Sequence, residues 1–131
     1  MGGAVVLSPP SGSDRFVLMK PTHCFLALAL SACQAASPEK MIVEFPVHPE
    51  TRDEFIAGLN EILVDTRAYD GCIGVTVWTN EEDDDFVWLY EEWATREDQA
   101  AYLNWRIETG NTAHLSPFIK GDLRFLWLEE H

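Results

Sequence analysis

The sequence predicts an α+β fold, and three observations lead to this prediction. Strand-like and helix-like segments follow one another between residues 41 and 131 in the order β-α-β-β-α-β. The length of 131 residues, with 47% hydrophobic and 24% charged residues, is typical of one globular domain. The charge also changes near residue 40: the first forty residues carry slightly more base than acid, whereas the rest is strongly acidic. We therefore expect a leader over residues 1–40, outside the fold, and one domain over residues 41–131.

The excess of acid excludes two classes of partner. The chain holds 22 acidic residues against 9 lysines and arginines, which gives a net charge of −13. Proteins bind nucleic-acid phosphates through clustered Lys and Arg side chains. We therefore expect no nucleic-acid partner and no attraction to an anionic membrane surface.

The first forty residues resemble an export signal. Residues 1–18 show no periodicity, and a short apolar run over residues 24–30 follows Met19 and its neighbouring lysine. The run is too short to be a transmembrane segment but has the length of a signal-peptide core. The segment LSAC resembles a bacterial lipoprotein processing box, in which Cys33 would be lipidated. Two alternatives stay open: a cytoplasmic protein translated from Met41, or an exported, lipid-anchored protein translated from Met19.

The predicted domain offers no obvious metal site. Cys72 is its only cysteine, so neither an internal disulfide nor a cysteine-based metal site can form there. The acidic run over residues 80–85 lacks the glycine and the spaced glutamate of an EF-hand. We expect this run to be a solvated hairpin tip.

The first strand and helix have clear boundaries. Residues 41–45 alternate as a strand does, and Pro46 ends them. Thr51 and Glu54 have the spacing of a capping box, behind which apolar residues recur at helical intervals. We expect this helix to end near Tyr69, because Asp-Gly follows.

The remaining elements complete the order. We expect strands over residues 72–78 and 86–93, a helix from Thr95 to Gly110, a helical turn over 114–119 and a last strand over 123–128. Asp98, three residues after Thr95, forms the second capping box. This order predicts a ferredoxin-like fold, in which both helices cover one face of a four-stranded antiparallel sheet.

The strand over residues 86–93 is apolar on both of its faces. Side chains alternate along a strand, so its two faces carry Phe86, Trp88 and Tyr90 on one side, and Val87, Leu89 and Trp93 on the other. Two helices cover only one face, and large exposed apolar patches mark interaction sites. We therefore expect a homodimer in which two sheets pack face to face.

The sequence resembles the antibiotic biosynthesis monooxygenase family. The resemblance rests on Pro49 with Asp53-Glu54-Phe55, Thr66-Arg67, Asp70-Gly71-Cys72, Leu89-Tyr90-Glu91-Glu92-Trp93, Ala101 to Arg106 and Glu108-Thr109-Gly110. It implies a dimeric α/β barrel that oxidises small aromatic or quinol-type substrates with dioxygen, without metal, flavin or other cofactor. The resemblance also implies a mechanism in which the substrate is deprotonated, passes an electron to dioxygen and recombines with it on carbon.

Residue by residue, the resemblance is incomplete. Trp93 stands at the pocket tryptophan of quinone-forming members, but Leu89 stands where those members have asparagine. For the heme-degrading branch, Ile42 replaces an asparagine, Tyr102 replaces a tryptophan, and only His114, after an insertion, could act as the axial ligand. Heme degradation is therefore the less favoured alternative.

The candidate site combines apolar walls with few polar groups. We expect a pocket between helices and sheet with substrate-binding Phe55, Leu59, Leu89 and Glu91, and catalytic Trp93, Tyr102, Arg106 and His114. His114 would be the base and the Trp93 indole an oxyanion donor. Arg106 would pair with Glu91 or neutralise a substrate oxyanion.

Structural roles for these residues stay open. His114 could be a surface residue, Trp93 a core residue, and Glu91 with Arg106 an ordinary ion pair. The alternative to an oxygenase is accordingly a non-catalytic dimeric module that binds an apolar metabolite or serves in stress.

Overall fold

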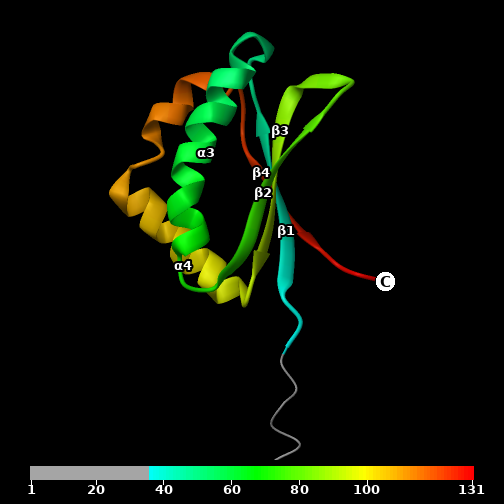
Figure 1. Cartoon of the computed structure of the whole chain (residues 1–131), viewed down its shortest axis with the longest axis vertical. Helices are drawn as coiled ribbons and strands as arrows, with labels where there is room; N and C mark the ends of the chain where they lie inside the picture. The colour runs from blue at the N-terminus through cyan, green and yellow to red at the C-terminus, as the bar shows by residue number, and fades with distance from the viewer. Residues whose placement is uncertain (1–35) are drawn as a thin grey trace, which may run out of the picture. The chain divides into compact units, whose positions relative to one another are not determined.

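The computed structural model describes residues 36–131, which form a four-stranded antiparallel sheet with two helices on one face (Figure 1). The elements are β1 (Glu39–Pro46), η3 (Pro49–Thr51), α3 (Arg52–Ala68), β2 (Cys72–Asn80), β3 (Asp83–Trp93), α4 (Arg96–Thr109), η4 (Ala113–Phe118) and β4 (Arg124–Leu128). The strands lie in the order β2-β3-β1-β4. The predicted α+β, ferredoxin-like arrangement is confirmed.

The segment predicted to be a leader falls mostly outside the described residues. Cys33 and the apolar run after Met19 lie there, so lipidation and export stay predictions. Strand β1 begins at Glu39, two residues before the predicted start of the domain. None of the helices within residues 36–131 is long and apolar enough to cross a membrane.

The two helix starts differ in how they are capped. Thr95 behaves as expected, because its hydroxyl oxygen accepts a hydrogen bond from the Asp98 backbone N–H at 3.1 Å. The predicted capping box at Thr51 is wrong. Thr51 lies in η3, its hydroxyl donates back to the His48 carbonyl at 3.5 Å, and its side chain caps no helix N–H. Pro49, the first residue of η3, fixes the backbone conformation at this helix start instead.

The helix ends follow the glycines. Gly110 adopts a left-handed conformation with φ 63° and ends α4, as the sequence predicts. Gly71, with φ 89°, turns the chain from α3 into β2. A side chain on Gly71 would collide with Asp98 as well as strain the backbone.

The β2–β3 hairpin is longer than the sequence indicates. Its ladder closes at Asn80 and Asp83, so the tight turn consists only of Glu81 and Glu82, and half of the expected polar turn, residues 83–85, belongs to β3. Side chains hold this turn: the Asn80 amide oxygen accepts from the Glu82 N–H at 3.0 Å. Apolar alternation missed the extension because the added residues, 79–80 and 83–85, are all polar or acidic.

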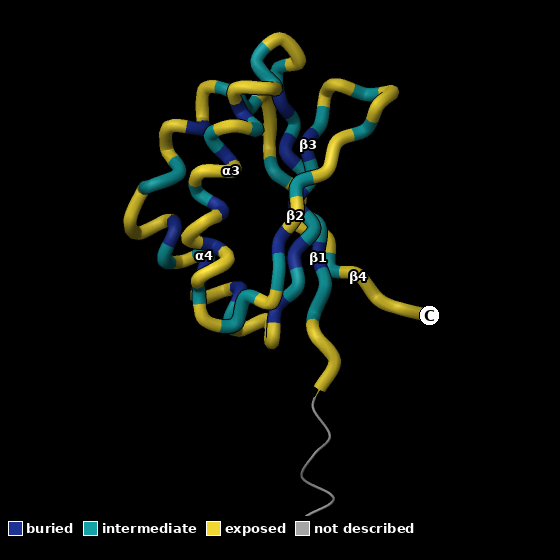
Figure 2. Tube along the Cα trace, viewed as in Figure 1, coloured by how far each residue is buried: buried dark blue, intermediate teal, exposed yellow. Residues whose placement is uncertain are grey.

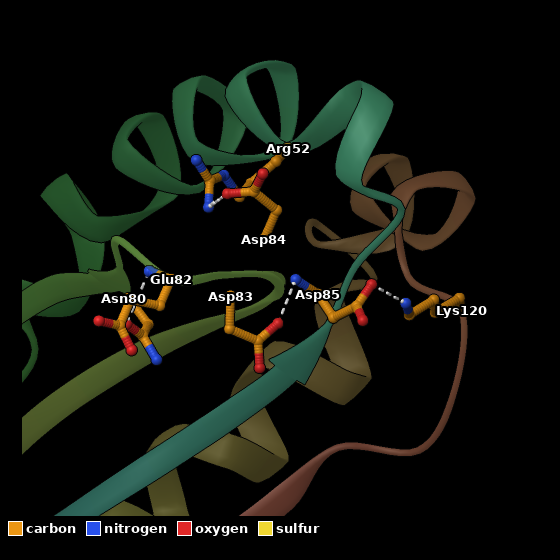
Figure 3. A network of polar contacts seen from close by, with 7 residues as sticks. All are labelled: Arg52, Asn80, Glu82, Asp83, Asp84, Asp85 and Lys120. Carbon is orange, nitrogen blue, oxygen red and sulfur yellow. Dashed lines mark hydrogen bonds and ion pairs between the residues drawn. The ribbon is translucent and has the colours of Figure 1, made fainter.

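Cations from two other segments pair with two acidic residues of the hairpin tip (Figure 3). Arg52, the first residue of α3, pairs with Asp84 at 2.5 Å, and Lys120 pairs with Asp85 at 2.5 Å. The tip is thereby tied to α3 and to the segment before β4. Within residues 36–131, no group of three His, Cys, Asp or Glu side chains is placed to hold a metal ion.

The helix-facing side of the sheet forms the core. Buried and half-buried positions alternate along β1 and β3 (Figure 2). Opposed residues of an antiparallel pair share a face, and Val43 lies opposite both Leu89 on β3 and Phe125 on β4. The core therefore sits between the helices and the central pair of strands.

The opposite side of the sheet has no covering element among the described residues (Figure 1). It carries Trp78, which is 58% exposed, and a shallow hollow of about 370 Å³ formed with Ile42, Trp88 and Tyr90. The Trp88 indole donates to Glu44 at 2.9 Å, and the Tyr90 hydroxyl donates to Glu92 at 2.9 Å. The alternation predicted for β3 is confirmed, and the homodimer remains a prediction.

We expect a single charge on this open face to disrupt the dimer. Trp88→Glu or Tyr90→Glu would bury a carboxylate between two sheets, so either variant should dissociate or aggregate. Sedimentation measures the outcome. Val64→Glu is the matched control, because Val64 is 64% exposed on α3 and lies on the other side of the molecule from this face. A wild-type protein that sediments as a monomer would contradict the prediction.

Candidate functional site

A cavity of about 320 Å³ lies between the two helices and the sheet. Its floor comes from β1 and β3 through Val43, Phe45 and Leu89. Helices α3 and α4 form the opposite wall. Residues of η4 and β4, among them Leu115 and Phe125, form a further side. The wall is mainly apolar, as in sites for small ligands.

The cavity brings together five of the eight predicted site residues. These are Leu59, Leu89, Glu91, Tyr102 and Arg106. The sequence also left open whether Tyr102 or Trp105 faces the pocket. Tyr102 does, whereas Trp105 is half-buried and packs against Tyr69 at 5.4 Å between ring centroids.

Phe55 and Trp93 lie behind the wall of the cavity. Both are fully buried. Phe55 packs against Phe45, with ring centroids 5.3 Å apart, and Trp93 packs against Tyr102 at 5.1 Å. They shape the cavity by supporting the residues that line it.

His114 is not among the residues that line the cavity, although its neighbours Ala113 and Leu115 are. It is exposed on η4, near Gly58 of α3. The next residue, Leu115, is 3% exposed and lines the cavity. A 3₁₀-helix has three residues per turn, so burying Leu115 turns His114 outward.

Several lining residues were missed by the sequence analysis. Gln99 is 7% exposed and precedes Tyr102 by one helical turn, so helical spacing from Tyr102 would have found it. Thr112, Ser116 and Phe125 also line the cavity, but they come from η4, its preceding loop and β4. Their positions depend on how the C-terminal part packs, which no local pattern encodes.

Glu91 is a buried carboxyl group with a single hydrogen bond among the described residues. It is 3% exposed, and its Oε2 accepts from the Trp93 indole N–H at 2.7 Å. Burial raises the pKa of Glu91 above its usual value, and the bond from Trp93 offsets part of that rise. At a given pH, Glu91 is therefore protonated to a larger extent than an exposed glutamate.

Arg106 does not form the expected ion pair with Glu91. Its Nη2 donates to the Ile62 carbonyl at 2.6 Å and to the Thr66 hydroxyl at 2.9 Å, and its Nε donates to the Tyr102 hydroxyl at 2.9 Å. These bonds turn the guanidinium toward α3. The Arg106 side chain is only 4% exposed and lines the cavity. Its Nη1 is buried and has no hydrogen-bond partner within residues 36–131.

Tyr102 completes the polar end of the cavity. Its hydroxyl lies 2.7 Å from the Thr66 hydroxyl and accepts from Arg106. Burial raises the pKa of Tyr102 above its usual value, against the opposing effects of Thr66 and Arg106. The group therefore stays a neutral phenol near pH 7.

Both the fold and a match to a family model show which family the chain belongs to. The family model for antibiotic biosynthesis monooxygenases matches residues 40–106. The chain belongs to the antibiotic biosynthesis monooxygenase family. No curated protein is significantly similar to it in sequence.

Solved structures show the same fold at low identity. A conserved protein from Methanosarcina mazei Go1 is 16% identical, with a TM-score of 0.64 over 74% of this chain and 96% of that one. A structure described as antibiotic biosynthesis monooxygenase is 17% identical, with a TM-score of 0.62 over 71% and 98%. Rv0793 from Mycobacterium tuberculosis is 20% identical, with a TM-score of 0.60 over 72% and 96%. At these identities the likeness concerns the fold alone.

The family match covers only part of this cavity. Glu91, Tyr102 and Arg106 lie inside the matched residues, whereas η4 and β4 lie beyond them. In this antibiotic biosynthesis monooxygenase family member, the polar end thus belongs to the matched region and the far wall does not. The polar end places a carboxyl group, a neutral phenol and a fixed cation beside mainly apolar walls.

We expect the Glu91 carboxyl to weaken the fold as pH rises. A raised pKa means that the folded state favours the protonated form, so its stabilising contribution is present below the usual glutamate pKa and is lost as pH rises through the raised value. A pKa that differs by one between the folded and unfolded states corresponds to about 1.4 kcal/mol of unfolding free energy. Glu91→Gln should therefore have an increasing advantage in free energy of unfolding as pH rises.

Urea unfolding at several pH values measures this effect. Glu61→Gln is the control, because Glu61 is exposed on α3. An advantage of Glu91→Gln that stays constant from about pH 4 to about pH 8 would contradict the prediction.

Proposed function

We propose that the protein is a cofactor-independent monooxygenase that oxidises a small aromatic, quinol-type substrate with dioxygen. One observation carries the proposal: an apolar cavity of about 320 Å³ whose polar end holds Glu91, Tyr102 and Arg106. Membership of the antibiotic biosynthesis monooxygenase family supports the same reaction class.

The cavity suits a planar ring with a hydroxyl group at one end. Leu59 and Leu89 offer apolar surfaces from the helix and sheet sides. Arg106 Nη1 has unused donors in a dry environment, where a charged hydrogen bond to a developing oxyanion is strong. Ionised aromatic hydroxyls are electron-rich, so holding the oxyanion favours electron transfer to dioxygen.

The overall reaction balances without an added reductant. A ring carbon that carries hydrogen, placed para to the hydroxyl, becomes a carbonyl with one oxygen atom of dioxygen. The second oxygen atom leaves as water with the hydroxyl proton and the ring proton. The substrate supplies all four electrons, so a quinone is the product.

A second function is favoured by the position of His114. This predicted base is exposed and lies outside the cavity. If no other group accepts the substrate proton, the cavity would hold an aromatic metabolite without turning it over. The protein would then be a non-catalytic ligand-binding module.

Oxygen consumption with a panel of phenols and naphthols that carry hydrogen para to the hydroxyl distinguishes the two functions. An oxygenase should consume one dioxygen for each quinone formed, in protein stripped of metal and without added flavin or heme. A binding module should retain an aromatic ligand and consume none. Activity that requires added heme, flavin or metal would contradict the cofactor-independent mechanism.

Arg106→Lys tests the oxyanion contact. It keeps the charge but loses the planar fork of donors, so we expect turnover to fall by roughly 10²-fold. Arg124→Lys is the control, because Arg124 is 63% exposed on β4 and lies outside the cavity. Equal turnover in the two variants would remove Arg106 from the reaction.

A further inference from the structure

We propose that Glu91 is the base that takes the proton from the substrate hydroxyl, and that Trp93 positions its carboxylate. The inference rests on the proposed function and names the residues that carry out its first step. It replaces the role that the sequence suggested for His114.

The geometry of the Glu91 carboxylate carries the inference. Its side chain projects from β3 toward the helices and lines the cavity. The Trp93 indole holds Oε2 at 2.7 Å, and no second hydrogen bond reaches the carboxylate from within residues 36–131. One carboxylate oxygen is therefore free to accept a proton from a ligand. An unpaired carboxyl group costs folding energy, so its presence at a core position points to a function.

The other titratable groups near the cavity fit the role of base less well. His114 is exposed, outside the lining. The Tyr102 hydroxyl lies 2.7 Å from the Thr66 hydroxyl, accepts from Arg106 and is a neutral phenol, so it is a weak proton acceptor. Cys72 is only partly buried and does not line the cavity.

The charged groups around Glu91 come from three elements. Cys72 from β2 interacts electrostatically with it, and burial raises the pKa of this thiol. Arg67 of α3 donates to the carbonyl of Val75, the residue opposite Glu91 on β2. Tyr102 and Arg106 of α4 line the same cavity as Glu91.

The charge balance of the cavity favours the transfer. Before the step, the carboxylate of Glu91 and the guanidinium of Arg106 face a neutral phenol. After it, a neutral Glu91 and the same guanidinium face a phenolate. The net charge does not change, so no additional charge is buried, and Arg106 Nη1 gains an anionic partner that it otherwise lacks.

The hydrogen bond from Trp93 decides its role. The indole has one N–H, and Glu91 already accepts it. Trp93 is therefore unavailable as an oxyanion donor and acts as a positioning residue through Glu91. The oxyanion contact falls to Arg106.

The protons balance through the reaction. The substrate O–H bond breaks, its electron pair stays on the substrate oxygen, and a new O–H bond forms on Glu91. Water formed from the second oxygen atom of dioxygen takes this proton and the ring proton. Glu91 returns to the carboxylate and is ready for the next substrate.

An anaerobic binding experiment tests proton transfer without turnover. The probe is 1-naphthol, whose absorbance changes when its hydroxyl ionises. Between the pKa of Glu91 and that of the probe, the wild-type protein should bind it as naphtholate without releasing a proton, so the Kd should not depend on pH. In Glu91→Gln the proton must leave to solvent, so affinity should rise about tenfold per pH unit.

Both the absorbance spectrum of bound 1-naphthol and the number of protons released on binding can overturn the proposal. Wild-type protein that binds 1-naphthol as the neutral phenol, or does not bind it, would overturn it. Equal pH slopes for wild type and Glu91→Gln would do the same. If Glu91→Gln fails to fold, calorimetry of the wild-type protein in two buffers of different ionisation enthalpy still reports whether a proton is released.

Turnover separates this inference from the proposed function. If the wild-type protein binds naphtholate but never consumes oxygen, the proposed function fails while the proton transfer stands. If it is active, Glu91→Gln should lower turnover by roughly 10²–10⁴-fold, and Glu61→Gln on the surface of α3 should not. The loss should shrink for more acidic substrates, which ionise without a base; a loss that is the same for every substrate would indicate structural damage and overturn the assignment.

Trp93→Phe should shift the pH dependence of kcat/KM. It removes the hydrogen bond that lowers the pKa of Glu91, so the acid limb of kcat/KM should shift to higher pH. A profile that drops in height without moving would contradict the positioning role.

Discussion

The buried guanidinium of Arg106 fixes the distance between the two helices, and the cavity depends on that distance. A charge removed from water costs several kcal/mol unless hydrogen bonds compensate it. Arg106 gains three such bonds, two to α3 and one to Tyr102 on its own helix. Its guanidinium also lies over the ring of Trp105, 4.7 Å from the centroid. Any shift of α4 along α3 would break several of these contacts at once, so the helices are held in one arrangement.

The same constraint keeps the site polar at one end only. Arg106 and Thr66 satisfy the Tyr102 hydroxyl, so the phenol can be buried at 8% exposure without an unmet hydrogen bond. Glu91 receives no comparable support. The fold therefore places one well-compensated cation and one poorly compensated carboxyl group in the same enclosure. Natural proteins tolerate such an imbalance mainly where function requires it.

Short-range patterns predicted the fold well. Helical spacing of apolar residues identified α3, the Thr95–Asp98 pair identified the start of α4, and alternation identified the two faces of β3. Each of these features depends on neighbours within one or two turns. The capping prediction failed at Thr51, whose side chain had two possible hydrogen-bond partners nearby. Thr51 bonds backward to His48 instead of forward into α3, a choice that composition does not reveal.

The site was predicted less completely, for a physical reason. Helical spacing and strand alternation show which side chains point toward the core, and five residues selected in this way line the cavity: Leu59, Leu89, Glu91, Tyr102 and Arg106. They do not show which of two inward polar groups a side chain will bond. The Arg106 guanidinium could bond either Glu91 or groups of α3, and which of them it bonds depends on the distance between the helix and the sheet. His114 does not line the cavity, because the burial of Leu115 sets which residues of η4 face inward.

Strand register couples the cavity to the open face of the sheet. In β3, Leu89 and Glu91 point toward the helices, whereas Trp88 and Tyr90 point away. A slip of one residue would exchange the two sets, putting Glu91 on the open face and an aromatic ring in the cavity.

The antiparallel partners on both sides of β3 prevent that slip. Val75 on β2 and Met41 on β1 both lie opposite Glu91, and both are buried on the helix-facing side. Shifting β3 would therefore expose apolar partners as well as move the carboxyl group. The register irregularities of the β2–β3 pair fall only near its two ends, at Cys72/Gly74 and Thr79/Asn80, so the ladder beside Glu91 stays regular. The ladder that aligns the apolar core thus also fixes the carboxylate at the cavity and presents Trp88 and Tyr90 on the uncovered face.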